Sequence, residues 1–480
     1  MQYEAIIGVE VHAQILTASK MFCRCSADIA HAAPNTHTCP VCLGMPGVLP
    51  VINQAAVEAT ILTGMALNCT IPPFSKFDRK NYHYPDLPKG YQISQYDYPL
   101  CTGGYLDVEL DGTTRRLGIR RVHLEEDTAR LVHEGGVSLV DFNRSSVPLM
   151  EIVSEADMRS TDDTYAYLVK LRQILRYLGV STGNMEEGAM RCEANISVRP
   201  VGAQEFGVKV EVKNLNSFRS VRLAIAYEIE RQVRVIEEGG RVHQVTMGWD
   251  ENRLCTVFQR SKEYADDYRY FPDPDLPPLE IDEARRQAIA ARLPELPDAR
   301  RERFVSDYRL RQEDARLLTE DRATADYYEA GVGAAQGRVA PQIVSNWILG
   351  ELFRLLGESG QEIGQCRVRP EGLIELLDLL QEGAINATVA KEVLEEMFAS
   401  GAAAKAIVQA RGLTQINDQD ALAAAVRDAL AAHPGPVQQY LDGKQQVLGF
   451  LIGQVMRATR GQANVQIVTE LLREELSRLG

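Results

Sequence analysis

Acidic and imidazole side chains alternate near the start of the chain and are the first candidates for chemistry. The stretch 7–15, Ile-Gly-Val-Glu-Val-His-Ala-Gln-Ile, alternates apolar and polar residues, and its polar positions include Glu10 and His12. Successive side chains of a strand point to opposite faces, so these two residues share one face of a predicted strand. A carboxylate beside an imidazole can hold a metal ion. The alternative at this point is a polar face in contact with solvent.

The same alternation recurs in three later segments. They are Arg121–Asp127, Arg191–Ser197 and Lys209–Lys213, and their polar positions include Glu125, Glu193 and Glu211. Their alternation predicts that the three segments join the first strand in a largely antiparallel sheet, with one face packed on helices and the other polar.

A further carboxylate, Glu151, stands alone in the apolar run 147–153. Burying a charge is costly unless it is paired or bound to a metal, so Glu151 needs a partner. The polar face then mixes carboxylates, which suit hard divalent cations, with Lys and Arg, which suit phosphate oxygens. A solvated face would also be polar, but this mixture favours a metal-nucleotide site for phosphoryl transfer.

Two close pairs of cysteines follow the first strand. Cys23 and Cys25 form one pair, and Cys39 and Cys42 form the other. Four thiols in two short loops suit a tetrahedral zinc ion that pins a loop, and the alternative is four free thiols. The chain has nine cysteines, an odd number, and several stand in apolar contexts. This usage indicates a reducing compartment, and we expect a cytoplasmic protein without a disulfide framework.

Composition and missing motifs exclude several classes of protein. The chain has no Gly-x-x-x-x-Gly-Lys-Ser/Thr phosphate loop and no Gly-x-Ser-x-Gly nucleophile elbow, which disfavours P-loop NTPases and α/β-hydrolases. With 52 basic and 66 acidic residues, the formal net charge is -14, so any nucleic-acid contact must come from a local patch. Neither a signal peptide nor a membrane-spanning run is predicted.

Helices, hairpins and one irregular segment must position these residues. Helical periodicity predicts helices over 53–68, 161–178 and 217–238, and Gly-containing pairs predict hairpin turns at 103–104, 111–112 and 135–136. The aromatic and basic segment 77–92 has no periodicity, which predicts either a binding loop or a solvated connection. Beyond residue 282 the pattern is helical throughout.

The C-terminal region is less acidic than the rest of the chain. From residue 409 onward seven Lys or Arg side chains balance seven Asp or Glu side chains. Lys444, Arg457 and Arg460 lie in or near a small basic turn between two predicted helices. These cations could contact RNA, or they could simply stabilise helix ends.

Eight stretches together resemble one family, the B subunits of aspartyl/glutamyl-tRNA amidotransferases, called GatB. The resemblance covers essentially the whole chain. The matching stretches are 8–14, 41–47, 77–97, 123–127, 148–155, 213–218, 267–276 and 448–464.

This resemblance implies an α+β protein of three domains. They are a mainly antiparallel, glutamine-synthetase-like catalytic cradle with a zinc loop over residues 1–292, an all-α helical domain over 293–408 and a small α-helical tail domain for tRNA over 409–480. The implied reaction is the ATP- and magnesium-dependent phosphorylation of the side-chain carboxylate of Glu on tRNA(Gln) or Asp on tRNA(Asn). Amidation by ammonia from glutamine then follows.

The resemblance implies partners as well. The chain would form a heterotrimer with an amidase-type glutaminase and a small third protein, which are the A and C members of such complexes. Misacylated tRNA would be the substrate. A contact with the non-discriminating synthetase is left open.

The resemblance also implies roles for individual residues. His12, Glu125 and Glu151 are expected to bind one magnesium ion, and Glu10, Glu193 and Glu211 a second, with Glu10, His12, Glu125 and Glu151 as the catalytic set. Contacts to ATP, to phosphate or at the mouth of an ammonia tunnel are expected from Lys80, Asn143, Lys209 and Lys213. Four features depart from the family pattern: Glu193 replaces a more usual Asp, the run 254–260 differs from the usual sequence, Asp266 stands where His is common, and Ala156 stands where Pro is common.

Overall fold

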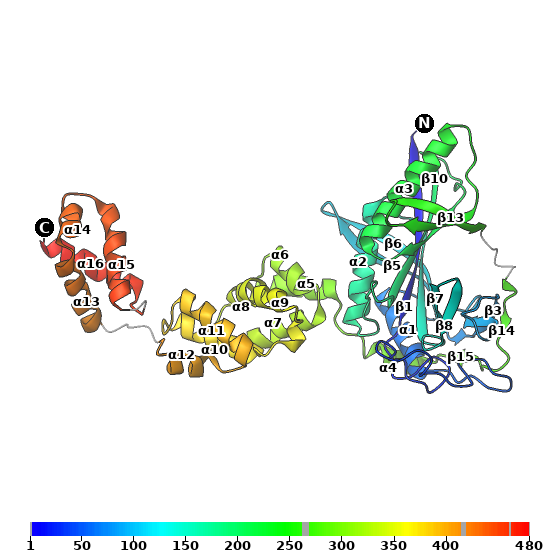
Figure 1. Ribbon diagram of the computed structural model, residues 1–480, viewed down its shortest axis with the longest axis horizontal. Helices are drawn as coiled ribbons and strands as arrows, with labels where there is room; N and C mark the ends of the chain where they lie inside the picture. Colours follow the sequence, from blue (N-terminus) through cyan, green and yellow to red (C-terminus); the bar gives the residue numbers. More distant parts are fainter. Residues whose placement is uncertain (1, 262–267, 414–418, 460–461, 480) are drawn as a thin grey trace. The chain divides into compact units, whose positions relative to one another are not determined.

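The structure is a computed structural model that describes residues 2–261, 268–413, 419–459 and 462–479. The chain divides into two compact units, Met1–Pro297 and Asp298–Gly480 (Figure 1). The first unit contains the sheets and the second is helical. The large, mostly antiparallel sheet and the helical C-terminal region agree with the predicted mixed class.

An eight-stranded sheet forms the centre of the first unit, in the order β13-β12-β11-β10-β1-β9-β6-β5. Neighbouring strands are antiparallel except β11 and β12. The four alternating segments of the sequence all lie in this sheet, as predicted. The strands are β1 (Tyr3–Gln14), β5 (Cys101–Leu110), β6 (Thr113–Glu126), β9 (Pro148–Ser154), β10 (Met190–Pro200), β11 (Val210–Leu215), β12 (Val245–Asp250) and β13 (Cys255–Ser261).

Three helices pack against the apolar face of this sheet. They are α1 (Gln54–Ala66), α2 (Thr161–Tyr177) and α3 (Phe218–Glu237), and α2 and α3 lie side by side (Figure 1). Each begins after a polar side chain that accepts a hydrogen bond from the first turn: Asn53, Ser160 and Ser217. Val9, Val11 and Ala13 of β1 are buried in the core beneath the helices. The three predicted helices are thereby confirmed to within two residues at each end.

Three smaller sheets accompany the large one. Strand pairs form between β2 (Phe74–Ser75) and β15 (Leu279–Glu280), between β7 (Arg130–Glu134) and β8 (Val137–Asp141), and among β14 (Phe271–Pro272), β3 (Asp78–Asn81) and β4 (Tyr91–Ser94). The segment 77–92, predicted to be irregular throughout, therefore carries strands at both ends. The strand β3 pairs with a segment nearly two hundred residues away, a contact that local periodicity does not encode.

Two of the three predicted hairpin turns are confirmed. Asp111 and Gly112, and also Gly135 and Gly136, have positive φ angles between paired strands. The turn predicted at 103–104 is wrong, because both glycines lie inside β5. A Cβ atom at Gly104 would come within 2.5 Å of Cys69 Sγ and 2.7 Å of Leu67 O. This glycine therefore allows close approach of a neighbouring segment and does not reverse the chain.

The first unit ends at Pro297, slightly beyond the predicted boundary after residue 292. After α4 (Glu283–Ala290), Leu293 and Leu296 pack against the core of the first unit. These two contacts hold the connecting segment on the first unit. No helix in the described parts of the chain is long and apolar enough to span a membrane.

The second unit contains two separate apolar cores, one between Phe304 and Val408 and one between Leu422 and Leu476. The boundary between helical and tail domains at residues 408 and 409 stays a prediction. From Pro297 onward the elements are α5 (Pro297–Tyr308), α6 (Gln312–Leu318), α7 (Arg322–Ala335), α8 (Pro341–Trp347), the π-helical turn η2 (Ile348–Leu352), α9 (Phe353–Ser359), the 3-10 turn η3 (Ile363–Gln365), α10 (Pro370–Gln381), α11 (Ala387–Ser400), α12 (Ala404–Arg411), α13 (Gln419–Ala432), α14 (Pro434–Leu441), the 3-10 turn η4 (Gln445–Val447), α15 (Leu448–Ala458) and α16 (Val465–Leu479).

Candidate functional site

Strand β1 is shared by two clusters of potential metal ligands on the polar face of the large sheet. Its neighbours are β9 on one side and β10 on the other. His12 lies opposite Glu151 of β9, and Glu10 lies opposite Glu193 of β10. Because Glu10 and His12 are two residues apart on one strand, their side chains lie on the same face of the sheet. His12 meets a carboxylate of β9, and Glu10 meets a carboxylate of β10.

The first cluster joins β1, β9 and β6. His12 Nε2 lies 3.5 Å from Glu125 Oε1 and 3.5 Å from Glu151 Oε2. One ligand atom from each of these three residues lies within 4.8 Å of the others, as a single bound cation requires. The register across β6 also brings His123 opposite Glu151, with Nε2 of His123 3.1 Å from Glu151 Oε2. The cluster predicted from the family resemblance is thus brought together, with His123 added to it.

Burial makes this first cluster electrostatically unusual. Glu125 is 3% exposed and Glu151 is 9% exposed. Burial opposes protonation of His12, but the carboxylate of Glu151, followed by those of Glu125 and Glu193, raises the pKa of His12 to about 9. Burial also opposes ionisation of Glu151, yet His123 and His12 hold its pKa well below the usual range. The carboxylates therefore favour positive charge on the neighbouring imidazoles, and a metal cation could supply that charge instead.

The second cluster joins β1, β10 and β11. Glu10, Glu193 and Glu211 each bring a carboxylate oxygen to within 4.8 Å of the other two. Neutral donors hold two of them: Asn195 Nδ2 donates to Glu10 Oε1 at 2.9 Å, and Thr246 Oγ1 donates to Glu211 Oε2 at 2.7 Å. Three carboxylates that converge in this way are a donor set for a hard divalent ion.

Lys213 lies at the edge of the second cluster. Its Nζ is 2.8 Å from Glu193 Oε2. Burial opposes the charge, but Glu193 and Glu211 outweigh it and raise the pKa of Lys213. Glu193 therefore reaches both a cation and its carboxylate neighbours.

The small sheet of β3, β4 and β14 contacts the first cluster. Ser94 Oγ of β4 donates to Glu125 Oε2 at 3.3 Å. Lys80 of β3 lies over the ring of Tyr268, with Nζ 4.8 Å from the ring centroid. Burial opposes its charge, but Tyr270, Tyr82 and then Glu125 and Glu151 raise the pKa of Lys80. Lys80 is therefore a cation beside the first cluster, where an anion could be bound.

Arg191 lies on the same face, directly opposite His12 on β10. Its Nη2 donates to Asp127 Oδ2 at 2.8 Å, and Gln14 Nε2 donates to the same oxygen at 2.9 Å. The sequence placed Arg191 and His123 on the polar face but gave no reason to select them as functional. Their positions beside His12 and Glu151 emerge only from the strand register.

The remaining predicted phosphate contacts are placed differently. Asn143 is buried, its Nδ2 donates to Ala33 O at 2.7 Å, and its Oδ1 accepts from the backbone N–H of His37 at 2.8 Å. The amide thus anchors the loop between the two cysteine pairs. A contact of Asn143 to phosphate or at a tunnel mouth stays a prediction. Lys209 is exposed and precedes β11, which begins at Val210.

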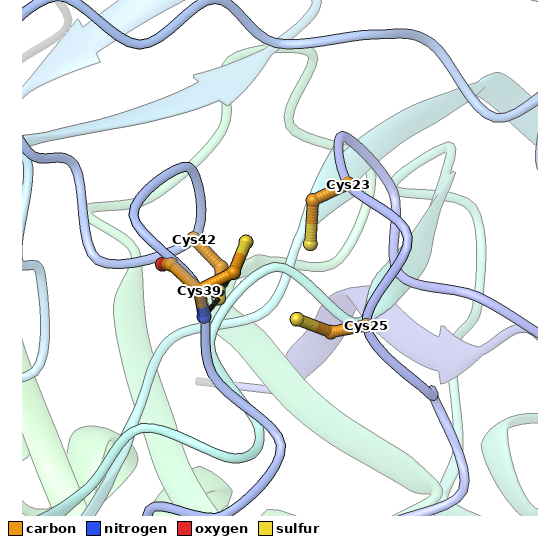
Figure 2. Close-up of side chains that lie close together, drawn as sticks. All are labelled: Cys23, Cys25, Cys39 and Cys42. Atoms are coloured by element: carbon orange, nitrogen blue, oxygen red, sulfur yellow. Dashed lines mark hydrogen bonds between the residues drawn. The ribbon is translucent and has the colours of Figure 1, made fainter.

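The four predicted cysteines converge between two loops, and their sulfurs point toward a common centre (Figure 2). The sulfurs of Cys39 and Cys42 are 3.9 Å apart, and the backbone N–H of Cys39 donates to Cys42 Sγ at 3.2 Å. A hydrogen bond from Cys23, followed by those from Cys39 and the charge of Lys20, lowers the pKa of Cys42 to about 5. Four convergent thiols with one favoured as thiolate fit a zinc ion by the chemistry of the donor set.

The predicted tRNA contacts lie in the tail. Lys444 and Arg457 are exposed, and Arg457 is in the last turn of α15. Arg460 lies outside the described residues. The comparisons with known proteins supply the context for these positions.

Two family profiles match the chain: the GatB/GatE catalytic domain over residues 5–287 and the GatB domain over residues 326–476. The B subunit of the aspartyl/glutamyl-tRNA(Asn/Gln) amidotransferase from Moorella thermoacetica is 56% identical over 480 residues, covering 99% of this chain and 100% of the relative. The chain belongs to the GatB family.

Other GatB relatives are similarly close. The corresponding B subunits from Dehalococcoides mccartyi and Thermomicrobium roseum are 54% and 56% identical, and the alignments cover at least 99% of both chains in each pair. GatB proteins are chains of tRNA-dependent amidotransferases, which places this chain among the carbon–nitrogen ligases that use glutamine as amide donor.

Proposed function

We propose that this chain activates the side-chain carboxylate of Glu or Asp carried by a misacylated tRNA and then converts it to the amide. The observation that supports this proposal most directly is the pair of ligand clusters that share β1, one around His12 and one around Glu10. Two adjacent cation sites on one face suit the transfer of a phosphoryl group between two anionic substrates.

The chemistry proceeds in two balanced steps. A carboxylate oxygen of the aminoacyl side chain attacks the γ-phosphorus of ATP, the bond to the β–γ bridging oxygen breaks, and ADP leaves. Ammonia then attacks the carbonyl carbon of the acyl phosphate, phosphate leaves with the bonding electron pair, and the nitrogen loses a proton to form the amide. The first step needs charge neutralisation, and both steps need water to be kept from the acyl phosphate.

The chain's own residues would divide these tasks. His12, Glu125 and Glu151 would hold one magnesium ion, and Glu10, Glu193 and Glu211 a second. When bound, such ions neutralise phosphate charge and orient its oxygens. Lys80 and Lys213 would place positive charge beside the two clusters, and the small sheet that contacts Glu125 through Ser94 would limit access of water to the first.

The other expected components fit the same proposal. The four cysteines would hold a structural zinc ion. We further propose that ammonia comes from an amidase-type glutaminase partner, that a small third protein completes the heterotrimer, and that the tail contacts tRNA through Lys444 and Arg457. Exposed cations contribute to RNA affinity mainly through phosphate, so their contribution should weaken as salt rises.

The test of the proposal uses the full chain assembled with its two partners. Glu10→Gln and Glu125→Gln remove one carboxylate charge from each cluster, and Glu4→Gln is the matched control. Glu4 lies on the same strand β1 but pairs with Arg199 at 2.7 Å, outside both clusters. We expect both cluster variants to lose ATP-dependent amidation while binding misacylated tRNA as wild type does, and the control to retain activity.

Three results would contradict the proposal. Normal amidation by both cluster variants would exclude these clusters from the reaction. A wild-type complex that binds misacylated tRNA but neither hydrolyses ATP nor forms the amide would make the chain a tRNA-binding scaffold. Activity on free glutamate without tRNA would instead indicate a free-standing ligase for a small carboxylate.

A further inference from the structure

A lysine side chain is completely buried beside the cysteine cluster. Lys20 follows β1 and has an exposed fraction of 0%. Its Nζ donates to Cys42 Sγ at 3.7 Å and to the backbone oxygen of Phe142 at 3.2 Å. Within the described residues these are the hydrogen-bond partners of the ammonium group, and neither belongs to a carboxylate.

A buried ammonium group is costly unless a negative charge or several strong acceptors surround it. The carbonyl of Phe142 supplies a dipole but no charge. The sulfur of Cys42, which also accepts the backbone N–H of Cys39, is the remaining candidate for the counter-charge. The Cys42 sulfur is therefore the acceptor beside Lys20 that could carry the counter-charge, as it would when it binds a metal ion.

A tetrathiolate zinc centre needs a compensating positive charge, just as the buried ammonium group needs a negative one. Four thiolates exceed the charge of one zinc ion, so the centre is anionic and is stabilised by nearby N–H donors and cations. Cys42 is 1% exposed, so water cannot supply this stabilisation at that sulfur. Lys20 is the buried cation at this position.

Lys20 also connects the cysteine cluster to the large sheet. Besides the contact with Phe142, its backbone N–H donates to Cys25 O at 2.9 Å, and the next residue, Met21, donates to Ser146 O at 2.7 Å. Ser145 Oγ donates to Cys42 O at 3.2 Å. The segment 142–147 leads directly into β9, which carries Glu151.

We propose that Lys20 is the internal counter-cation of the cysteine metal centre, donating to Cys42 and tying the loaded centre to the segment that precedes β9. Lys20 is a positioning residue in this assignment and touches no substrate. The inference rests on the proposal that the four cysteines bind zinc.

The experiment measures zinc affinity in the full chain by competition with a chromogenic chelator. Lys20→Met keeps the length of the side chain and removes its charge, and we expect zinc affinity to fall about 10- to 100-fold, as for other residues that support metal ligands. Lys20→Arg keeps a cationic donor, and we expect it to recover part of that loss.

Lys89→Met is the matched control. Lys89 is a half-buried lysine in the same region, but among the described residues its Nζ pairs with Glu126 and donates no hydrogen bond to a cysteine. We expect this variant to bind zinc as wild type does. A loss of affinity in Lys89→Met equal to that in Lys20→Met would show a general effect of removing a lysine, and would overturn the proposal.

The absorption spectrum of the cobalt-substituted protein gives a second measurement. If Lys20 only stabilised the fold, its replacement would not change this spectrum. Removal of an N–H donor makes a thiolate a stronger electron donor, so the thiolate-to-cobalt charge-transfer band of Lys20→Met should shift to longer wavelength. If Lys20→Met does not fold, the same comparison is made between wild type and Lys20→Arg, whose band should also move.

The outcomes separate the two proposals. A wild-type chain without bound zinc would overturn both the zinc proposal and this inference. Bound zinc in wild type, with unchanged affinity and unchanged cobalt spectrum in the Lys20 variants, would overturn the role of Lys20 alone.

Discussion

The carboxylate clusters and the cysteine cluster are built in opposite ways. Glu10 and Glu211, which belong to one carboxylate cluster, lie on strands separated by most of the first unit's sequence. The four cysteines lie within one segment, from Cys23 to Cys42, between β1 and α1. The carboxylate clusters depend on the hydrogen-bonded register of five strands, and the cysteine cluster depends on the conformation of loops.

This difference determines what holds each cluster in place. In the sheet, a ladder of backbone hydrogen bonds fixes His12 opposite Glu151, and a register slip of one residue would turn the ligands to the other face. In the loops, side chains such as Asn143 and Lys20 do the anchoring. We therefore expect sheet variants to change chemistry with little change in structure, and loop variants to change local order first.

The largest effect should come from Glu151→Gln. Glu151 contacts both His12 and His123, so its neutralisation removes a ligand and leaves the partly exposed His12 and the buried His123 without their shared partner. We expect the rate of ATP-dependent amidation by the assembled complex to fall by about 100-fold or more. This loss exceeds the usual effect of changing a residue that only supports a metal ligand, because Glu151 would itself bind the metal. Zinc content should stay unchanged. Glu155→Gln, an exposed carboxylate just past β9, is the control, and equal losses in both variants would contradict a specific role.

Cys39→Ser should act on the loops first. With one of four ligands removed, we expect bound zinc to be lost and protease cleavage within residues 26–38 to become faster, because metal binding no longer closes the loop. Amidation should fall by about tenfold, less than for Glu151→Gln, since the sheet register is unaffected. Cys255→Ser in β13 is the control. Unchanged cleavage rates after zinc loss would show that the loop is held without the metal.

Asn143→Ala should separate the observed loop anchor from the predicted phosphate contact. The change removes two hydrogen bonds, one to the Ala33 carbonyl and one from the His37 N–H, which should together lower the free energy of unfolding by about 1–3 kcal/mol. Urea unfolding measures this loss. If Asn143 only anchors the loop, the KM for ATP should stay within about twofold of wild type. A large rise in KM with unchanged stability would instead support a contact between Asn143 and a phosphate.

Ser94→Ala should have the smallest effect. It removes one long hydrogen bond, 3.3 Å, from an uncharged hydroxyl of the small sheet to the carboxylate of Glu125, worth about 0.5–1.5 kcal/mol. We expect the magnesium concentration for half-maximal activity to rise by a few-fold at most, because His12 and Glu151 still hold the cluster. A loss as large as that of Glu151→Gln would mean that the small sheet, and not the strand register, positions Glu125.

The sequence by itself determined the local features. Alternation placed Glu10 and His12 on one strand face, helical periodicity located α1, α2 and α3, and the spacing of Cys23 to Cys42 indicated a four-thiol centre. These predictions succeeded because each depends on residues of one short segment, where local backbone geometry limits which side chains can meet.

Only the tertiary structure decided the pairings between distant segments. It brought His123 and Arg191 beside the first cluster through strand register, joined Asn143 to the loop between the cysteine pairs, and buried Lys20 beside Cys42. It also showed that Gly104 accommodates a neighbouring segment and does not form a turn. Such contacts join residues up to about two hundred positions apart, and no local period or spacing encodes which of many possible partners a side chain will reach.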